Sequence, residues 1–244
     1  MRPTTFAGRT VLVTGANRGL GQALVAEALR RGAKRVYAGT RQPLSHPDER
    51  VTPLLLDVTD RAQIQDARNR VDALDILINN AGVSVPDDLS ERSALEQHLA
   101  VNLYGTLDVT RAFLPSLARQ HGAVVNVVSL GAVAAVPVLP AYSVSKAAAL
   151  SLTQSLRALL AGRGVSVYAV LPGPIDTDMV RELDIAKTSP EDVARATLDG
   201  VERGDEEIFP DPMSQLLADG WRAGVAKAME RQNAALVAAA PIAA

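Results

Sequence analysis

The sequence predicts an α/β protein, formed as a single domain around a parallel sheet with helices on both faces. Short apolar segments alternate with segments of helical period almost from end to end, which is typical of this fold class. Most apolar segments are continuous rather than alternating, as strands covered on both faces should be. A length of 244 residues suits one such domain. We expect its core at about residues 8–210 and a C-terminal helix and tail over residues 211–244.

Each element can be placed in order. The expected strands are residues 10–14, 35–39, 51–56, 76–79, 123–129 and 165–171, with a short final strand at 207–209. Helical period predicts helices around residues 21–31, 61–70, 93–120 and 143–161. Residues 41–50 and 172–189 are expected loops. Strand and helix alternating in this way imply right-handed crossovers.

Composition and charge exclude several classes of function. The chain has no cysteine, which excludes disulfides, thiolate metal sites and cysteine nucleophiles. A net charge of −2 with both signs scattered gives no basic stripe for nucleic acid. The first apolar stretch, Val11 to Val13, is too short for a signal peptide or a membrane span, so we expect no membrane partner and a cytoplasmic location. His46, His98 and His121 show no metal-ligand spacing; we expect surface or capping roles for them and no metal.

A glycine-rich turn, TGANRGLG at residues 14–21, follows the first strand. Glycine at positions 15, 19 and 21 permits a tight strand-to-helix turn and a close approach of backbone N–H groups to a bound group. A pyrophosphate would sit there at the positive end of the following helix. A tight turn without a ligand is the alternative. The position after the first strand of a parallel α/β pattern favours a dinucleotide.

The end of the second strand indicates which dinucleotide binds. An enzyme that uses NAD usually carries an acid there for the ribose 2′-hydroxyl, whereas one that uses NADP presents arginine. This strand ends Gly39-Thr40-Arg41 without an acid, and Arg18 in the glycine-rich turn is a second cation. Two cations favour a 2′-phosphate and therefore NADP (NADPH). The alternative is that both arginines are solvated surface charges.

A tyrosine and a lysine lie one helical turn apart in AYSVSK, at Tyr142 and Lys146. A free tyrosine titrates near ~10, so proton exchange near neutrality requires a lower pKa, to which a neighbouring cation contributes. Ser129 ends an apolar strand, where ligands of open α/β sheets bind, and its hydroxyl could hold a substrate oxygen. A chance surface pair is the alternative for Tyr142 and Lys146. Asn102 lies in an apolar helical patch, where a core asparagine bonded to backbone is equally open.

The ordered set of motifs resembles the short-chain dehydrogenase/reductase family over the chain from Gly8 to about Phe209. The motifs are TGANRGLG at 14–21, LDVTD at 56–60, NNAG at 79–82, VN at 101–102, NVVS ending at Ser129, YSVSK at 142–146 and PGPIDT at 172–177. The resemblance implies a Rossmann-type, doubly wound sheet with strand order 3-2-1-4-5-6-7. Residues 18 and 41 look like those of NADP-preferring members.

The resemblance also implies roles in hydride transfer between NADPH and a ketone or aldehyde. Tyr142 would be the general acid in reduction, and Lys146 would bind the nicotinamide ribose and lower the pKa of Tyr142. Ser129 would orient the carbonyl, and Asn102 would hold a water of a proton relay. The residues expected to contact the cofactor are Gly15, Asn17, Arg18, Gly19, Leu20, Gly21, Thr40, Arg41, Asp57, Val58, Asn80, Ala81, Gly82, Tyr142, Lys146, Pro172, Gly173, Ile175 and Thr177.

Substrate and assembly are less closely specified. Apolar residues near the site, Leu130, Val136, Pro137 and Leu139, favour an apolar carbonyl compound, and a short lid segment suggests an open pocket. A 3-oxoacyl-thioester reductase and a non-catalytic NADP-binding sensor are the alternatives. The helix after Lys146 is apolar around much of its circumference, and in the family it pairs across a subunit interface. We therefore expect a homodimer or homotetramer.

Overall fold

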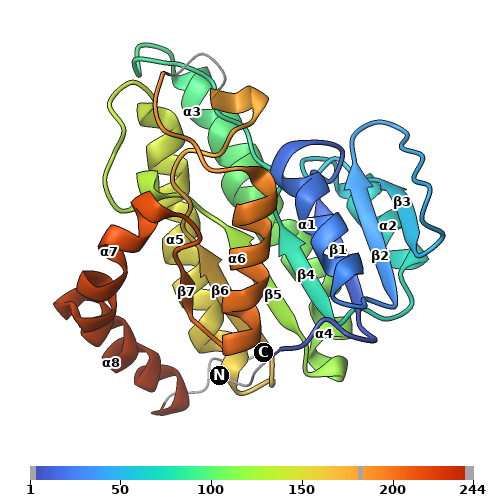
Figure 1. The fold of residues 1–244 in the computed structure, drawn as a ribbon. Helices are drawn as coiled ribbons and strands as arrows, with labels where there is room; N and C mark the ends of the chain where they lie inside the picture. Colours follow the sequence, from blue (N-terminus) through green and yellow to red (C-terminus); the bar gives the residue numbers. More distant parts are fainter. Residues whose placement is uncertain (1–3, 181–183, 240–244) are drawn as a thin grey trace.

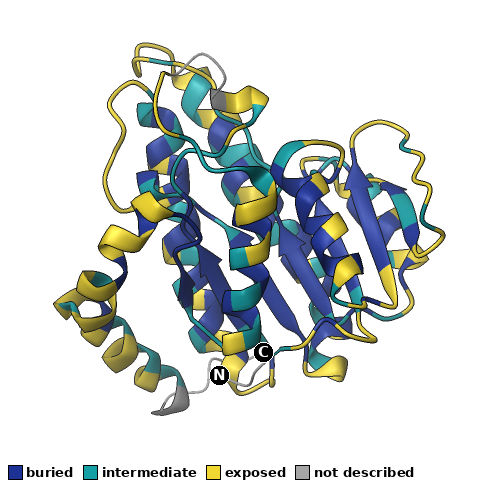
Figure 2. Cartoon of the chain, in the orientation of Figure 1, coloured by how far each residue is buried: buried dark blue, intermediate teal, exposed yellow. Residues whose placement is uncertain are grey.

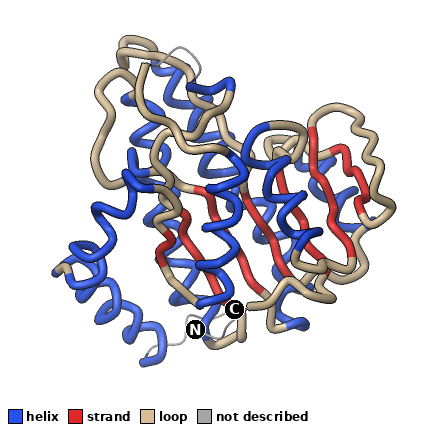
Figure 3. Tube along the Cα trace, viewed as in Figure 1, coloured by secondary structure: helices blue, strands red, loops and turns tan. Residues whose placement is uncertain are grey.

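A computed structural model of the chain describes residues 4–180 and 184–239 (Figure 1). Seven parallel strands form one sheet in the order β3-β2-β1-β4-β5-β6-β7, so the expected Rossmann-type order is confirmed. Figure 3 shows the strands side by side in a single layer between helices. Residues 240–244, the end of the C-terminal tail, lie outside the described residues.

The strands and helices have the following bounds. The strands are β1 (Thr10–Thr14), β2 (Arg35–Thr40), β3 (Val51–Leu55), β4 (Ile76–Asn79), β5 (Ala123–Val127), β6 (Ser166–Val170) and β7 (Glu207–Ile208). The α-helices are α1 (Gly19–Arg30), α2 (Arg61–Arg70), α3 (Arg92–Leu99), α4 (Thr106–Gln120), α5 (Pro140–Ala161), α6 (Pro190–Arg203), α7 (Pro212–Ala223) and α8 (Val225–Ala239). Three short elements complete the list: the π-helical η1 (Ala100–Gly105) and the 3₁₀ turns η2 (Leu130–Ala132) and η3 (Asp178–Val180).

Helices cover both faces of the sheet. On one face α1 and α6 bury Leu24 and Leu198 against strand residues such as Val13. On the other, α2, α4 and α5 pack onto strand residues such as Leu12, which points the opposite way from Val13 because side chains alternate along a strand. Figure 2 shows the strands almost wholly buried. Burial on both faces explains why the strands read as continuous apolar runs.

Several helix ends follow from local chemistry. Asp60 caps α2 by accepting from the backbone N–H groups of Ala62 and Gln63. Helix α5 begins at Pro140, earlier than the expected residue 143, because proline at the first helical position needs no N–H partner. The expected helix over residues 93–120 is divided into α3, η1 and α4. At the end of η1, a Cβ on Gly105 would lie 2.6 Å from Val58 Cγ2, so the segment passes very close to the residues after β3.

The C-terminal region forms two helices, α7 and α8, beside the β7 end of the sheet (Figure 1). Buried charges hold α8 in place. The Lys227 ammonium lies 2.9 Å from Glu207 and 2.8 Å from Glu230, and only 1% of its side chain is exposed. Arg157 of α5 pairs with the same two glutamates. Opposite charges compensate one another here, which permits their burial.

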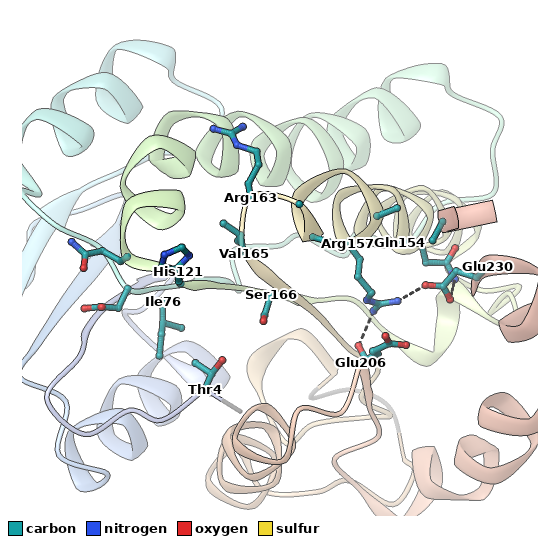
Figure 4. A pocket seen from close by; sticks show the side chains of 18 of the residues that line it. Thr4, Ile76, His121, Gln154, Arg157, Arg163, Val165, Ser166, Glu206 and Glu230 are labelled. Atoms are coloured by element: carbon teal, nitrogen blue, oxygen red, sulfur yellow. Dashed lines mark hydrogen bonds and ion pairs between the residues drawn. The ribbon is translucent and has the colours of Figure 1, made fainter. Parts of the chain in front are cut away.

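A surface pocket lies beside this ionic cluster, at the amino ends of the strands, where Ile76 and Ser166 begin β4 and β6. Figure 4 shows Arg157 reaching Glu230 and the backbone of Glu206 from one wall. The buried charges of the ionic cluster beside this pocket are already paired with one another. The residues expected to be functional lie at the opposite edge of the sheet, the carboxyl ends of the strands.

Candidate active site at the carboxyl edge of the sheet

Ser129 and Tyr142 meet directly after β5. The Ser129 hydroxyl accepts a hydrogen bond from the Gly131 N–H at 3.0 Å. A Cβ on Gly131 would lie 3.4 Å from Ser129 Oγ and 3.6 Å from the Tyr142 ring, so glycine leaves room beside both groups. The tyrosine side chain is half-buried. The two side chains are therefore neighbours, and their catalytic roles stay a prediction.

Lys146 lies one turn along α5, with its Nζ 5.7 Å from the centre of the Tyr142 ring. The ammonium donates to the Val127 carbonyl at 2.9 Å. Burial lowers the pKa of Lys146 to about 8 because the charged form loses water. Burial also raises the pKa of Tyr142, against a smaller opposite effect of its hydrogen bond to Ser129. The lowering by Lys146 expected from the sequence thus stays a prediction.

Asn102 is buried within the π-helical η1 and bonded to the main chain. Its Oδ1 accepts from the Val83 N–H at 2.9 Å, and its Nδ2 donates to the Val83 carbonyl at 3.0 Å and to Ser145 Oγ at 2.9 Å. These bonds match the alternative that the sequence left open for Asn102, a core asparagine bonded to backbone. A Cβ on Gly82 would lie 3.2 Å from Asn102 Oδ1 and 3.6 Å from Lys146 Nζ, so the three residues adjoin. The water relay remains a prediction.

The glycine-rich turn lies against the residues after β4. Gly15 and Gly19 have φ of +65° and +52°, in the left-handed region that favours glycine. A Cβ on Gly21 would lie 2.1 Å from the Gly15 carbonyl oxygen, which no other residue could accommodate. Asn80 Nδ2 donates to the Thr14 carbonyl at 3.0 Å and so ties the two segments together. Arg18, the N-cap residue of α1, makes no side-chain hydrogen bond to the helix, which begins at the switch point between β1 and β4.

The two arginines expected at a 2′-phosphate have different surroundings. Arg18 donates to Asp178 Oδ2 at 2.8 Å, with 67% of the Arg18 side chain exposed. Arg41 is exposed directly after β2. The neighbouring Thr40 hydroxyl donates to the Gln42 carbonyl. The ion pair connects the glycine-rich turn to the loop after β6, a contact with no signal in the sequence.

The remaining predicted cofactor residues lie at the same edge. Asp57 Oδ1 accepts from the backbone and hydroxyl of Thr59, directly after β3. The Pro172 carbonyl accepts from the Leu130 N–H at 3.0 Å. The Gly173 N–H donates to Asp211 Oδ2 at 2.7 Å.

The loop that follows β6 also approaches the glycine-rich turn. Ile175 pairs with Thr188, and a Cβ on Gly19 would lie 3.0 Å from Thr177 Cγ2. Residues 181–183 of the expected lid lie outside the described residues, and the open pocket stays a prediction.

One histidine differs from its expected role. His46 and His121 are exposed, as the sequence predicts, but His98 on α3 is fully buried. Its ring meets that of Tyr142 edge-on, with the ring centres 6.4 Å apart and the planes at 74°. The expectation of a surface or capping role for His98 was therefore wrong. No spacing rule identifies it, because its partners are main-chain atoms and a ring far along the sequence.

Two wider features bear on function. Among residues 4–180 and 184–239, no group of three or more His, Cys, Asp or Glu side chains is arranged to hold a metal ion. Within those same residues, no helix has the length and apolarity needed to cross a bilayer.

The strand order, with the glycine-rich turn and Tyr142 at one edge of the sheet, defines the class: a Rossmann-type α/β oxidoreductase. The sequence model of the short chain dehydrogenase family matches residues 9–188. The chain therefore belongs to this family of oxidoreductases, which act on CH–OH and C=O groups.

Relatives of known structure and activity are similar over most of the chain. A short chain dehydrogenase from Burkholderia cenocepacia J2315, crystallised with NADP, is 38% identical, with a TM-score of 0.86 over 94% of this chain and 98% of that one. L-fucose dehydrogenase of Bos taurus is 33% identical over 77% of this chain and 73% of the relative. Estradiol 17-beta-dehydrogenase 2 of Mus musculus is 34% identical over 72% of this chain; the match spans 51% of that relative, about half its length.

Proposed function

We propose that the chain is an NADPH-dependent oxidoreductase that reduces a ketone or aldehyde to an alcohol, or catalyses the reverse, with Tyr142 as the proton donor. The observation that carries the proposal is that the Ser129 hydroxyl and the Tyr142 ring lie side by side at Gly131, with Lys146 one turn away. These groups lie at the carboxyl ends of the strands, where open α/β sheets bind their ligands.

The residues present fit NADP. The turn before α1 is so tight that residue 21 has to be glycine. Because no side chain caps α1, the backbone N–H groups at its start can bind a pyrophosphate. The end of β2, Gly39-Thr40-Arg41, carries no acid to favour NAD, and Arg18 and Arg41 are exposed cations suited to a 2′-phosphate. The NADP complex of the similar Burkholderia enzyme supports the same choice. When bound, the nicotinamide supplies or accepts the hydride.

The protein then contributes orientation and a proton. Ser129 donates to the substrate oxygen and holds it beside the phenol. Burial raises the pKa of Tyr142, which keeps the phenol protonated but opposes proton transfer near neutrality, so a charged Lys146 has to act in the opposite direction. In oxidation the phenol must become a base, and a charged Lys146 favours its deprotonated form. Asn102 fixes residue 83 at the floor of the site through two backbone hydrogen bonds.

The rim of the site favours an apolar substrate. Large apolar side chains are exposed on the segments that follow β4, β5, β6 and β7, including η3 and the start of α7. They are Val85, Leu89, Val133, Val136, Val138, Met179, Ile185 and Met213. Acidic residues on the same loops, including Asp88 and Asp184, disfavour an anionic substrate. We therefore propose an uncharged, apolar carbonyl compound as the substrate.

The outer face of α5 supports a homo-oligomer. Val144 and Leu159 are 47% and 42% exposed there, and the other exposed side chains of α5 are alanines and serines. An uncharged helix face of this kind suits a protein interface, whose centre is depleted of charge. We propose a homodimer or homotetramer that buries this face.

The proposed function is tested with Tyr142→Phe in an NADPH-oxidation assay over a panel of apolar ketones and aldehydes. The phenylalanine variant should lose at least about a thousandfold in kcat, since it removes the proton donor, and should bind NADPH as the wild type does. Tyr104→Phe, which alters an exposed tyrosine on η1, is the matched control and should keep full activity. Substantial turnover by Tyr142→Phe would remove Tyr142 from its assigned role.

A further inference from the structure

We propose that His98 is a positioning residue, whose neutral imidazole fixes the backbone at Val85 while it packs against the Tyr142 ring, and so shapes the substrate side of the active site. The inference rests on the proposed role of Tyr142 and names a residue that acts on it through a neighbouring segment. His98 lies in the last turn of α3 with no exposed surface.

The two ring nitrogens of His98 both contact main chain. Nε2 accepts a hydrogen bond from the Val85 N–H at 3.1 Å, so this nitrogen carries no proton. Nδ1 lies 2.7 Å from the Ala94 carbonyl oxygen, which can only accept, so Nδ1 carries the proton. The neutral ring alone satisfies both contacts. His98 therefore has no nitrogen left to exchange a proton with Tyr142, and its effect on the reaction is through position.

The ring of His98 also contacts Tyr142 directly. With centres 6.4 Å apart and planes at 74°, the two rings have the edge-to-face geometry that aromatic pairs prefer. Because His98 is fully buried and bonded at both nitrogens, its ring has a single orientation. The His98 side chain thus contacts both the proposed proton donor, Tyr142, and the backbone of Val85.

Residues 83–89 are tied at three points between the cofactor edge and the start of α5. Asn102 binds both backbone groups of Val83. His98 binds the N–H of Val85. The Asp87 carboxylate accepts long bonds of 3.3 and 3.4 Å from the Ala141 N–H, directly before Tyr142. The middle tie fixes the backbone at the exposed, apolar Val85, which we assigned to the substrate rim.

Three substitutions separate the hydrogen bond from the ring. His98→Phe keeps a ring of similar size but leaves the Val85 N–H without its acceptor. His98→Gln places an amide oxygen where Nε2 lies and keeps the acceptor while losing the ring. His98→Asn can reach Ala94 but ends short of Val85. If His98 acts by holding Val85, glutamine should rescue what phenylalanine and asparagine lose.

The first measurement is hydrogen–deuterium exchange of the peptide covering residues 83–89 in the cofactor-free protein. Exchange in this peptide should rise about tenfold in His98→Phe and His98→Asn and stay near wild type in His98→Gln, because one backbone hydrogen bond is lost or kept. Fast exchange in His98→Gln, or wild-type protection in His98→Phe, overturns the proposal. If His98→Phe or His98→Asn fails to fold, the other still gives this contrast with His98→Gln. If His98→Gln fails to fold, wild-type protection in His98→Phe still overturns the proposal.

The second measurement is steady-state kinetics with the best ketone of the panel. KM for the ketone should rise about tenfold in His98→Phe and His98→Asn, with the dissociation constant of NADPH within about twofold of wild type. Equal losses in all three variants, or a loss of NADPH binding, would mean a general structural role and would overturn the proposal. A wild-type enzyme without carbonyl reduction would instead refute the proposed function, while the exchange experiment would still decide the role of His98.

Discussion

Lys146 carries its ammonium in a place with little access to water, and its pKa is about 8 rather than 10.5. Below pH 8 the folded and unfolded chains both hold the proton. Between about pH 8 and 10.5 the unfolded chain keeps the proton that the folded chain releases, so stability rises with pH. The unfolding free energy should gain on the order of 3 kcal/mol across this window from Lys146.

Urea unfolding of the cofactor-free protein at a series of pH values measures this rise. Lys146→Met should remove the rise, because methionine does not titrate. Lys34→Met, which alters an exposed lysine, is the control and should leave it in place. The same pH dependence in wild type and Lys146→Met would show that the ammonium is not held away from water.

Arg18 and Asp178 form an exposed ion pair, and the proposed 2′-phosphate would compete with Asp178 for the arginine. Asp178→Asn should therefore bind NADPH a few-fold more tightly, the scale of an exposed ion pair. The double variant Arg18→Ala with Arg41→Ala should weaken NADPH much more than NADH. Dissociation constants from calorimetry with both cofactors check the two expectations, and equal losses for NADH and NADPH would contradict the assignment of the arginines.

At the residue scale the sequence predicts the site only where spacing carries the signal. Tyr142 and Lys146 are one helical turn apart, and Ser129 lies at the carboxyl end of a strand, two residues after β5 ends at Val127, so their meeting follows from periodicity and topology. His98 has no such signal, because it binds the backbone of Ala94 and Val85. Asn102 could be read either way from sequence, since an asparagine bonded to backbone leaves no pattern in its neighbours.

At the scale of elements, Asp211 joins the C-terminal helices to the loop expected to line the cofactor. One carboxylate oxygen caps α7 by accepting from the Ser214 N–H at 2.9 Å. The other accepts from the Gly173 N–H at 2.7 Å. The side chain is 2% exposed, so both bonds form away from water. Asp211, at the start of α7, thus fixes the backbone of Gly173 in the loop after β6.

Asp211→Asn should destabilise the protein by about 1–3 kcal/mol and weaken NADPH, because an amide nitrogen would face one of two N–H donors. Chemical denaturation and cofactor titration measure the two effects. Asp219→Asn, an exposed position on α7, is the control and should change neither. Unchanged NADPH binding in a destabilised Asp211→Asn variant would limit Asp211 to capping the helix.

Most element types were predictable, whereas the division of the helix over residues 93–120 was not. The apolar spacing continues through η1, so periodicity gives no reason for a π-helical segment there. The structure places Asn102 in η1 with its side chain bonded to Val83, and Gly105 against Val58. Both contacts are with distant segments, which a local pattern does not contain.

At the scale of the whole molecule, the uncharged outer face of α5 predicts assembly. Light scattering at micromolar concentration should give a mass of at least twice the 25.7 kDa chain. Leu159→Lys should shift the mass toward the monomer, because a charge at an interface centre must lose water. Leu236→Lys, at an exposed leucine of α8, is the control and should leave the mass unchanged. A monomeric wild type would contradict the proposed assembly.

Every pair of neighbouring strands in the sheet is parallel, so none is joined by a tight hairpin. The central strand β1 pairs with β4, matching Val11 to Ile76, only after the chain has built β2 and β3 on the opposite side. A nascent chain leaving the ribosome therefore carries one open edge of β1 until residues 76–79 have been made. Such late, long-range pairing exposes a growing polypeptide to aggregation, and makes chaperone protection most valuable before β4 emerges.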